Sequence, residues 1–248
     1  MDNKRKSRSL LVLLAPVIVF FVFFGGIELF VNLMGIRKWV FPAPSSMFIA
    51  LGVNFLEYAP HLLITLEEII IGFMIGAPIG ILLGAVISQF KALDRALSPY
   101  VILIVMTPLI TLVPMLLTWF GPGLIIKIIA AAIQTFPIVL MNSATGFSSV
   151  PQIKLELMKS MGAGRIESFL KVTLPFALPD VFTGLKLGAI FATIAAVTAE
   201  MVGGTSGLGN LIGTYTGYIQ LSKAFAAVLL VASIGFTLYN VLSLLEDK

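Results

Sequence analysis

Six long apolar segments dominate this sequence and decide what it can fold into. Each is close to the ~20 residues that an α-helix needs to cross the hydrocarbon core of a bilayer. Apolar residues make up 58% of the chain and charged residues only 11%, whereas soluble domains contain roughly 25% charged residues. We therefore predict an all-α integral membrane protein, with one domain over residues 1–248. The predicted spans cover residues 10–33, 62–87, 97–120, 124–141, 181–202 and 224–245.

The first apolar segment also has features of a secretory signal peptide. A basic run at residues 4–8 precedes it. However, apolar character resumes after Gly25-Gly26, and no small-residue cleavage site follows. We therefore expect an uncleaved first span. The chain contains no cysteine, which excludes disulfides and thiolate metal sites.

Lysine and arginine are distributed unequally between the two sides of the predicted bundle. With the N-terminus inside, the inner side holds Lys4, Arg5, Lys6, Arg8, Lys91, Arg95, Lys154, Lys159, Arg165, Lys171 and Lys248. The outer side and its boundary hold Arg37, Lys38, Lys127 and Lys223. By the positive-inside rule, both termini and the segment 148–179 are predicted to be cytoplasmic. Topology thus explains the net charge of +4, and we expect no nucleic-acid partner. Lys127 is expected to reach the outer headgroups, and Lys186 the inner ones.

Two of the predicted spans carry small residues at every fourth position. The second span has Gly72, Gly76, Gly80 and Gly84, and the fifth has Gly184 and Gly188. Small residues let neighbouring backbones approach closely in lipid. We therefore predict close helix packing along both ridges. The spacing leaves open whether these two helices also move against each other.

Proline residues are expected to kink or interrupt several spans. Pro78 lies in the second span, Pro108 and Pro114 in the third, and Pro137 in the fourth. Broken helices near the midplane often mark substrate sites in transporters, although a structural kink explains each proline equally well. The candidate pathway residues are Thr107, Pro108, Thr111, Gln134 and Glu200.

Ionisable residues inside the spans lie nearer the predicted outer end than the centre. These acids are Glu28, Glu67, Glu68 and Glu200. Solvation at the interface and a role in a pathway both remain open for them. The only histidine, His61, makes neither a metal site nor a catalytic triad. The glycine-rich segment 203–209 lacks the Gly-Lys-Ser/Thr ending of a P-loop and is expected to be a flexible outer turn.

The outer segment between the first two spans contains two prolines, Pro42 and Pro44. Each disfavours helix at the preceding residue. The sequence therefore predicts an extended turn there, followed by a short helix over residues 47–56. Ser45 or Ser46 is expected to cap that helix.

A charged segment at residues 151–179 separates the fourth and fifth spans. Ile153, Leu157 and Met161 recur at four-residue spacing, which predicts a short amphipathic helix. Gly162 is expected to break that helix. A second short helix is expected over residues 165–173, ended by Leu174-Pro175. We predict two short helices in an L shape.

The spacing of residues in this segment resembles the cytoplasmic loop motif of ABC importer permeases. That motif reads Glu-Ala-Ala, three residues, Gly, nine residues, a hydrophobic residue, any residue and Leu-Pro. The chain has Glu156, Gly162, Val172 and Leu174-Pro175 in register, with Leu157-Met158 in place of the two alanines. Trp119-Phe120-Gly121, Ala199-Glu200-Met201 and the segment 206–209 are similar to the nitrate, sulfonate and taurine subgroup.

The resemblance implies a transport subunit of an ATP-driven importer, and not an enzyme. Such a subunit forms the pathway for a small, in some members anionic, solute such as a sulfonate, taurine or nitrate. It implies no cofactor in this chain, with ATP and Mg in a partner ATPase. The implied partners are a second copy of the permease, two ABC ATPase subunits, an extracytoplasmic substrate-binding protein and the bilayer of a bacterial-type inner membrane. The residues implied in ATPase coupling are Glu156, Leu157, Met158, Gly162, Ala163, Phe169, Leu174 and Pro175.

Other interpretations remain open at this point. The charged segment could be an amphipathic loop lying on the membrane surface. The chain could be a secondary transporter driven by an ion gradient, which would need ionisable residues deep in the bundle. It could also be a vitamin- or precursor-importing ABC permease, or a membrane scaffold without transport.

Overall fold

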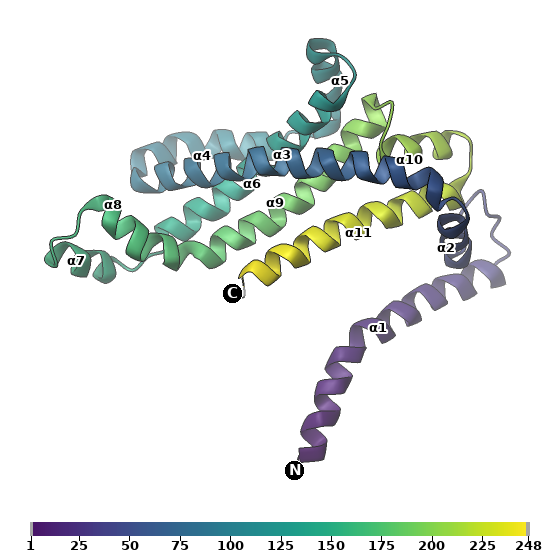
Figure 1. Ribbon diagram of the computed structural model, residues 1–248, viewed down its shortest axis with the longest axis horizontal. Coiled ribbons are helices and arrows are strands. Elements are labelled where there is room, and N and C mark those ends of the chain that lie inside the picture. The colour runs from purple at the N-terminus through teal and green to yellow at the C-terminus, as the bar shows by residue number, and fades with distance from the viewer. Residues whose placement is uncertain (1, 247–248) are drawn as a thin grey trace.

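The computed structural model describes the backbone of residues 2–246 and the side chains of residues 15, 17–90 and 92–246. Within these residues the chain is helical, without a β-strand, as the composition predicts (Figure 1). The side chains of Lys4, Arg5, Lys6, Arg8, Lys91 and Lys248, which carry part of the orientation argument, lie outside the described residues. The elements are α1 (Asp2–Leu33), α2 (Pro44–Val53), α3 (Phe55–Gln89), α4 (Lys91–Met106), α5 (Leu109–Phe120), α6 (Leu124–Ser148), α7 (Gln152–Ser160), α8 (Arg165–Ser168), the π-helix η1 (Phe169–Thr173), α9 (Leu174–Gly203), α10 (Leu208–Gly217) and α11 (Leu221–Glu246).

Four helical segments of the described chain are long and apolar enough to cross a membrane. They are α3, α6, the continuous helix Arg165–Gly203 that contains α9, and α11. The pair α4–α5 would make a fifth if it counts as one bent span. The apolar part of α1 that was searched, Val17–Leu33, is shorter. Four to five spans are therefore supported, and the sixth remains a prediction.

The predicted third span, residues 97–120, is not one straight helix. It divides into α4 and α5, whose axes meet at 89°. Pro108 supplies no backbone N–H and pushes the preceding Thr107 into an extended conformation (φ −70°, ψ 120°). Figure 1 shows α5 leaving the direction of the bundle as a result. The other interior prolines, Pro78, Pro114 and Pro137, lie within helices that continue past them.

Helix α6 lies between the two glycine ridges, and both ridges pack against it. A Cβ placed on Gly80 of α3 would lie 2.6 Å from the carbonyl oxygen of Phe136. A Cβ on Gly184 of α9 would lie 2.8 Å from Cβ of Asn142. The same holds along the ridges for Gly72, Gly76, Gly84 and Gly188, each of which faces α6. The ridges therefore bring α3 and α9 against α6, and not directly against each other.

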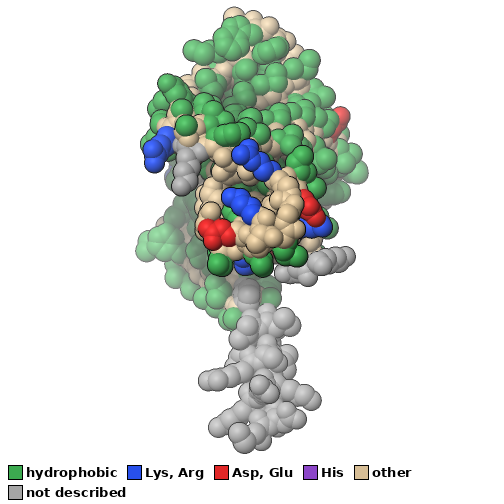
Figure 2. All heavy atoms as spheres, turned by 90° about the vertical axis from the view of Figure 1, so that its left-hand side faces the viewer, with side chains coloured by type: hydrophobic (Ala, Val, Ile, Leu, Met, Phe, Trp, Pro, Cys, Tyr) green, Lys and Arg blue, Asp and Glu red, His purple; other side chains and the backbone are tan. Residues whose placement is uncertain are grey.

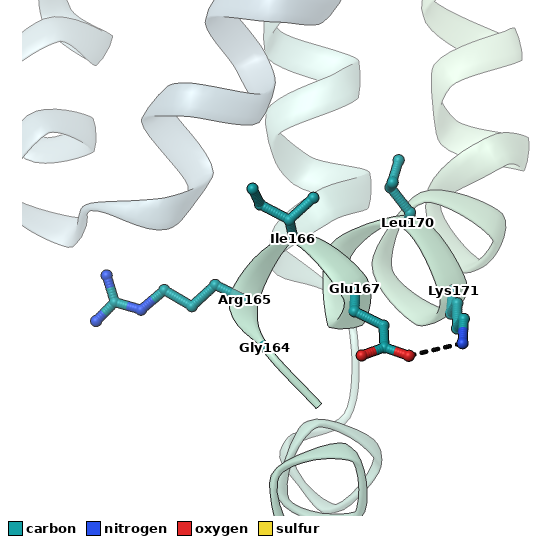
Figure 3. Close-up of a pocket in the computed structure, with 6 residues that line it drawn as sticks. All are labelled: Gly164, Arg165, Ile166, Glu167, Leu170 and Lys171. Atoms are coloured by element: carbon teal, nitrogen blue, oxygen red, sulfur yellow. Dashed lines mark hydrogen bonds and ion pairs between the residues drawn. The ribbon is translucent and has the colours of Figure 1, made fainter. Parts of the chain in front are cut away.

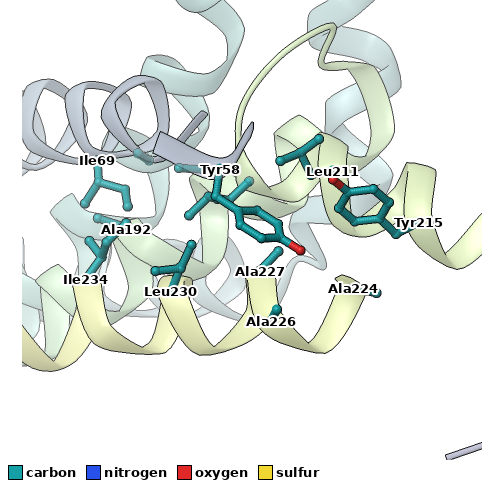
Figure 4. Close-up of a cluster of buried hydrophobic side chains, with 13 residues drawn as sticks. Tyr58, Ile69, Ala192, Leu211, Tyr215, Ala224, Ala226, Ala227, Leu230 and Ile234 are labelled. Carbon is teal, nitrogen blue, oxygen red and sulfur yellow. The ribbon is translucent and has the colours of Figure 1, made fainter. Parts of the chain in front are cut away.

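A cluster of buried apolar side chains holds α10 and α11 against α3 and α9 (Figure 4). Tyr58 of α3 is fully buried in it, and its hydroxyl donates a hydrogen bond to the carbonyl oxygen of Lys223 at 3.1 Å. Its ring contacts that of Tyr215 edge to face, with centroids 6.1 Å apart. This cluster fixes the end of the bundle opposite α7 and α8.

The short surface helix α2 begins earlier than predicted and is not capped by a serine. It starts at Pro44, with Ala43 as the N-cap and no side-chain cap. Ser45 instead donates its backbone N–H and its hydroxyl to the Glu28 carboxylate, at 2.9 and 2.8 Å. Glu28 thus ties α2 to α1.

We predict that Gly72→Ala destabilises the bundle. The added Cβ would overlap Cβ of Ala131 and lie 2.9 Å from the carbonyl oxygen of Ile128, so α3 and α6 must move apart. Overpacking of this kind costs about 1–3 kcal/mol, and thermal unfolding of the purified protein in detergent measures it. Gly52→Ala in α2, where an added Cβ meets nothing within 4 Å, is the control and should not destabilise.

Candidate functional site

The segment between α6 and α9 contains the short helix α7, as predicted, followed by α8 and η1, which run on into α9 as one continuous helix. Helix α7 ends in a Schellman motif, the C-cap in which a left-handed residue closes the last turn. The Ala163 N–H donates to Met158 O at 3.0 Å, and the Gly162 N–H donates to Lys159 O at 3.0 Å. Gly162 has φ +80°, a conformation that glycine adopts without strain. The chain then reverses into α8.

Large apolar side chains of this loop point away from the bundle. Ile153, Leu157 and Met161 are 71%, 60% and 74% exposed, and together they form a stripe on one face of α7. Ile166 and Leu170 beyond the reversal are exposed as well. Figure 2 looks onto this end of the molecule, where basic and acidic side chains gather beside apolar ones. The surface combines apolar contact area with charges of both signs.

Beside the stripe lies a shallow open pocket on α8 and η1 (Figure 3). An ion pair between Lys171 and Glu167, 2.7 Å long, borders it. Its lining residues are Gly164, Arg165, Ile166, Glu167, Leu170 and Lys171.

The residues predicted for ATPase coupling divide into an outward-facing and an inward-facing set. Phe169 packs on Phe147 of α6, with ring centroids 5.3 Å apart, and Leu174 joins the same cluster. These two therefore attach the loop to its own bundle. The remaining predicted residues are exposed or half-buried: Glu156, Leu157, Met158, Gly162, Ala163 and Pro175.

The prediction that Leu174-Pro175 ends the second helix is wrong. The helix continues from Arg165 to Gly203. Proline has no N–H and its ring clashes with the carbonyl four residues before it. The chain widens by one residue at this point, because the Leu174 N–H donates to Phe169 O across the π-helical turn η1. A π-turn of this kind is rare and frequently occurs at functional sites.

A second polar site lies at the other end of the bundle and is buried. Lys127 of α6 is 2% exposed and forms a 2.7 Å ion pair with Glu68 of α3, which is fully buried. Lys127 also donates to the carbonyl oxygen of Ser206 at 3.0 Å. Glu200 of α9, also fully buried, accepts the Thr65 hydroxyl at 2.6 Å. We name Thr65, Glu68, Lys127 and Glu200 the clasp.

The clasp holds the loop 203–209 by its backbone. The Gly209 N–H donates to Glu200 Oε2 at 2.6 Å, and the Leu208 N–H donates to the Thr65 hydroxyl at 2.8 Å. The Gly207 N–H donates to His61 Nδ1 at 3.0 Å. A Cβ on Gly207 would overlap the Glu200 carboxylate. The expectation of a flexible turn is corrected, because side chains of three helices anchor this loop.

The clasp also corrects the predictions for its charged members. Lys127 does not reach headgroups, since its ammonium group is buried against Glu68. Interface solvation does not apply to Glu68 or Glu200, which are fully buried, while the neighbouring Glu67 is exposed. Outside the clasp, Lys186 of α9 forms a 2.7 Å ion pair with Glu246 of α11.

The predicted pathway residues do not form one site. The Thr107 and Thr111 hydroxyls donate to carbonyl oxygens three or four residues back in the chain, and Gln134 is half-buried on α6. Glu200 is closed off inside the clasp. Only Thr107, Pro108 and Thr111 share a location, at the α4–α5 break.

A separate hollow of about 420 Å³ lies nearer the α7 end of the bundle. Asp94 and Ser98 of α4 line it together with Thr145 of α6, and none of the predicted pathway residues does. No group of three His, Cys, Asp or Glu residues that could hold a metal occurs among the described residues.

Apolar helices around a central α6, with an ordered loop exposed at one end, are the architecture of a multi-pass membrane protein. Comparison with known proteins makes the class specific. Residues 76–248 match the family described as "Binding-protein-dependent transport system inner membrane component", and the chain belongs to this family of ABC importer permeases.

Two relatives and one solved structure illustrate this. The chain is 33% identical to the riboflavin transport system permease protein RibX of Chloroflexus aurantiacus, over 87% of this chain and 81% of that protein. It is 27% identical to the putative aliphatic sulfonates transport permease protein SsuC of Bacillus subtilis, over 96% and 85%. The inward-facing MetNI methionine ABC transporter contains a chain with a TM-score of 0.57 and 26% identity, matched over 74% of this chain and 91% of that one.

Proposed function

We propose that this chain forms half of the translocation pathway of an ABC importer and is driven by separate ATPase subunits. The working assembly would contain two copies of this chain, two cytoplasmic ATPase subunits that bind ATP and Mg, and an extracytoplasmic substrate-binding protein. The family of binding-protein-dependent permeases supports this assembly. The chain itself would catalyse no chemistry.

The observation that carries the proposal is the exposed apolar stripe on α7. Ile153, Leu157 and Met161 are exposed on a helix that also carries the charged residues Lys154, Glu156 and Lys159. Apolar side chains presented on a rigid helix suit a groove on a partner protein. The C-cap at Gly162 fixes the turn from α7 into α8, and Phe169 of η1 packs the following turn on α6. A push on α7 would therefore be transmitted to α6 and α9 as a rigid-body motion.

The orientation of the chain follows from where an ATPase can bind. We place α7 and both termini in the cytoplasm, and the clasp and α10 on the outer side. The excess of lysine and arginine in segments on the α7 side supports this orientation. The membrane would be a bacterial-type inner membrane.

The transported solute is proposed to be a small molecule delivered by the binding protein. Sulfonates, taurine and nitrate are the first candidates, since relatives carry these names. A vitamin or vitamin precursor is the second, since other relatives are named for riboflavin and formylaminopyrimidine. Thermal-shift screening of the cognate binding protein against both classes decides between them.

We predict that Glu156→Lys abolishes ATP-driven uptake while the chain still inserts into the membrane. Glu156 is exposed beside the stripe, so charge reversal would disturb the docked ATPase without disturbing the bundle. Uptake in proteoliposomes and co-purification of the ATPase measure the effect. Glu167→Lys is the comparison variant. It reverses a charge on the exposed face of α8, in the same loop but away from the stripe. Normal uptake by Glu156→Lys, with the ATPase captured at wild-type strength, would contradict the proposed coupling.

A further inference from the structure

Directional polar bonds join α3, α6 and α9 at the outer end of the bundle. Lys127 connects α6 to Glu68 of α3, and Thr65 of α3 connects to Glu200 of α9. The loop 203–209 is bonded to the same groups through Ser206 and Gly209. Separating α3 from α6 would leave Glu68 and Lys127 unpaired in apolar surroundings, which is strongly unfavourable. Separating α3 from α9 would remove the Thr65 hydroxyl from the buried Glu200 carboxylate, which also costs free energy. This end of the bundle is therefore built to stay together.

The glycine ridges extend that unit along the length of the helices. A Cβ at Gly76 would lie 2.7 Å from the carbonyl oxygen of Ala132, and one at Gly84 would lie 2.9 Å from Cβ of Ser143. Backbones in such close contact interlock and do not slide past one another easily. The interlocked ridges favour α3, α6 and α9 as one body over the alternative that α3 and α9 rock against each other.

Helix α5 is attached differently. Its inward side chains, Leu109, Val113 and Leu116, are buried against an apolar surface made by Ile126 and Ala130 of α6 and Ala195 and Ala199 of α9. The side-chain hydrogen bonds of α5 are local, from Thr111 to Pro108 O and from Thr118 to Pro114 O. Moving α5 over this surface would exchange apolar contacts for other apolar contacts without breaking an ion pair.

Helix α5 has a candidate hinge at each end. The break at Thr107-Pro108 separates it from α4 with an 89° bend. At the other end, Gly121 has φ +73° in the turn into α6, and a Cβ there would meet nothing within 4 Å. The turn is therefore not packed against other atoms, and glycine tolerates large changes of φ. Hinges are typically a few residues at element ends that absorb such changes.

We propose that the clasp makes α3, α6 and α9 one rigid unit, and that α5 is the element that moves when the outer side opens. Glu68, Lys127 and Glu200 are then positioning residues for transport. They hold the loop 203–209 in place so that the motion is confined to α5. This inference rests on the proposed function, because it assumes an ATP-driven cycle.

Distance measurements between paired spin labels test the inference. This chain has no cysteine, so the cysteines introduced for labelling are the only ones in it, and the partner subunits are used in cysteine-free form. One pair, Trp119→Cys with Met201→Cys, spans α5 and α9; the control pair, Leu63→Cys with Met201→Cys, spans α3 and α9. All three positions are exposed. Distances are recorded in the complete complex, in lipid nanodiscs, with and without a non-hydrolysable ATP analogue. We expect the first distance to shift and the second to stay constant.

A second arm tests the clasp itself. In Glu68→Met with Lys127→Met, both buried charges are replaced by side chains of similar volume, a change that membrane and soluble cores often tolerate. We expect the distance between labels at 63 and 201 to become broad or nucleotide-dependent in this variant, and ATP hydrolysis to continue with reduced uptake. A merely structural role would leave hydrolysis and uptake in their wild-type ratio.

The outcomes separate the inference from the proposed function. An unchanged 119–201 distance in a complex with ATP-driven uptake overturns the inference and leaves the proposed function standing. A 63–201 distance that changes with nucleotide in the otherwise wild-type chain also overturns it, as does wild-type coupling in the double methionine variant. A complex without ATP-driven uptake contradicts the proposed function instead.

Discussion

Lys127→Met is expected to lower the free energy of unfolding by about 3–5 kcal/mol, the cost of leaving one partner of a buried ion pair alone. The Glu68 carboxylate would remain fully buried without its ammonium partner. Among the described residues its Oε2 atom already has no hydrogen-bond partner, so they offer little else to stabilise the charge. The carbonyl oxygen of Ser206 would also lose its donor. Thermal and denaturant unfolding of the detergent-solubilised protein measure the loss.

Two control variants make this prediction specific. Lys171→Met removes the lysine of an ion pair of the same 2.7 Å length, but here the side chains are 66% and 48% exposed. Water and counterions solvate such pairs, and their contribution is about 0–1 kcal/mol. Glu68→Met combined with Lys127→Met should recover most of the loss, because no charge remains unpaired. Equal effects of Lys127→Met and Lys171→Met would show that burial of the pair has no energetic consequence.

The helices could be predicted from the sequence because lipid leaves few alternatives. A backbone without water must satisfy its own hydrogen bonds, so an apolar run of about 20 residues becomes a helix. The break in the third predicted span could also be predicted, because Pro108 lacks a backbone N–H and disfavours helix at the residue before it. The glycine ridges predicted close packing, but the spacing of Gly72 to Gly84 does not say which helix fills the groove. Only the three-dimensional arrangement identifies α6 as the partner of both ridges.

The clasp could not be predicted in the same way. A lysine near the end of an apolar span is expected to extend its long side chain to the headgroups, and this is the basis of the expectation for Lys127. Its partner Glu68 lies 59 residues away in sequence. The anchoring of loop 203–209 depends on contacts over still longer separations, such as Thr65 with Leu208, 143 residues apart. The available signal was the opposite charge of Glu68 and Lys127, both placed near the same end of two predicted spans.

The segment between α6 and α9 shows a mixture of the two cases. Local sequence predicted α7 and the reversal at Gly162, because a C-cap of this kind is made by neighbouring residues. It did not predict that the second helix would run on into α9. Pro175 is accommodated by the π-turn at η1, and the packing of Phe169 on Phe147 holds the widened turn in place. Helix α8 is thus continuous with α9, and the C-cap turn at Gly162 joins it to α7.

Gly162→Val is expected to abolish ATP-driven uptake. Valine is β-branched and is strained at the φ of +80° that Gly162 adopts; a left-handed conformation costs a side chain about 1–2 kcal/mol. The Schellman motif would open, and the direction of α7 relative to α8 would change. The stripe of Leu157 and Met161 would then no longer face the ATPase, although the transmembrane helices, which Gly162 does not contact, would still form.

The matched control is Gly164→Val, two residues further along the same loop. Gly164 has φ −71° and ψ 170°, which any residue adopts, and an added Cβ would meet nothing within 4 Å. Uptake and ATPase capture should therefore stay at wild-type levels. The two variants add carbon atoms to the same exposed loop, so a difference between them reports the backbone conformation at Gly162 and not bulk. If both variants transport normally, the orientation of α7 is not what couples this chain to its ATPase. If Gly162→Val alone fails, coupling depends on the backbone turn at Gly162.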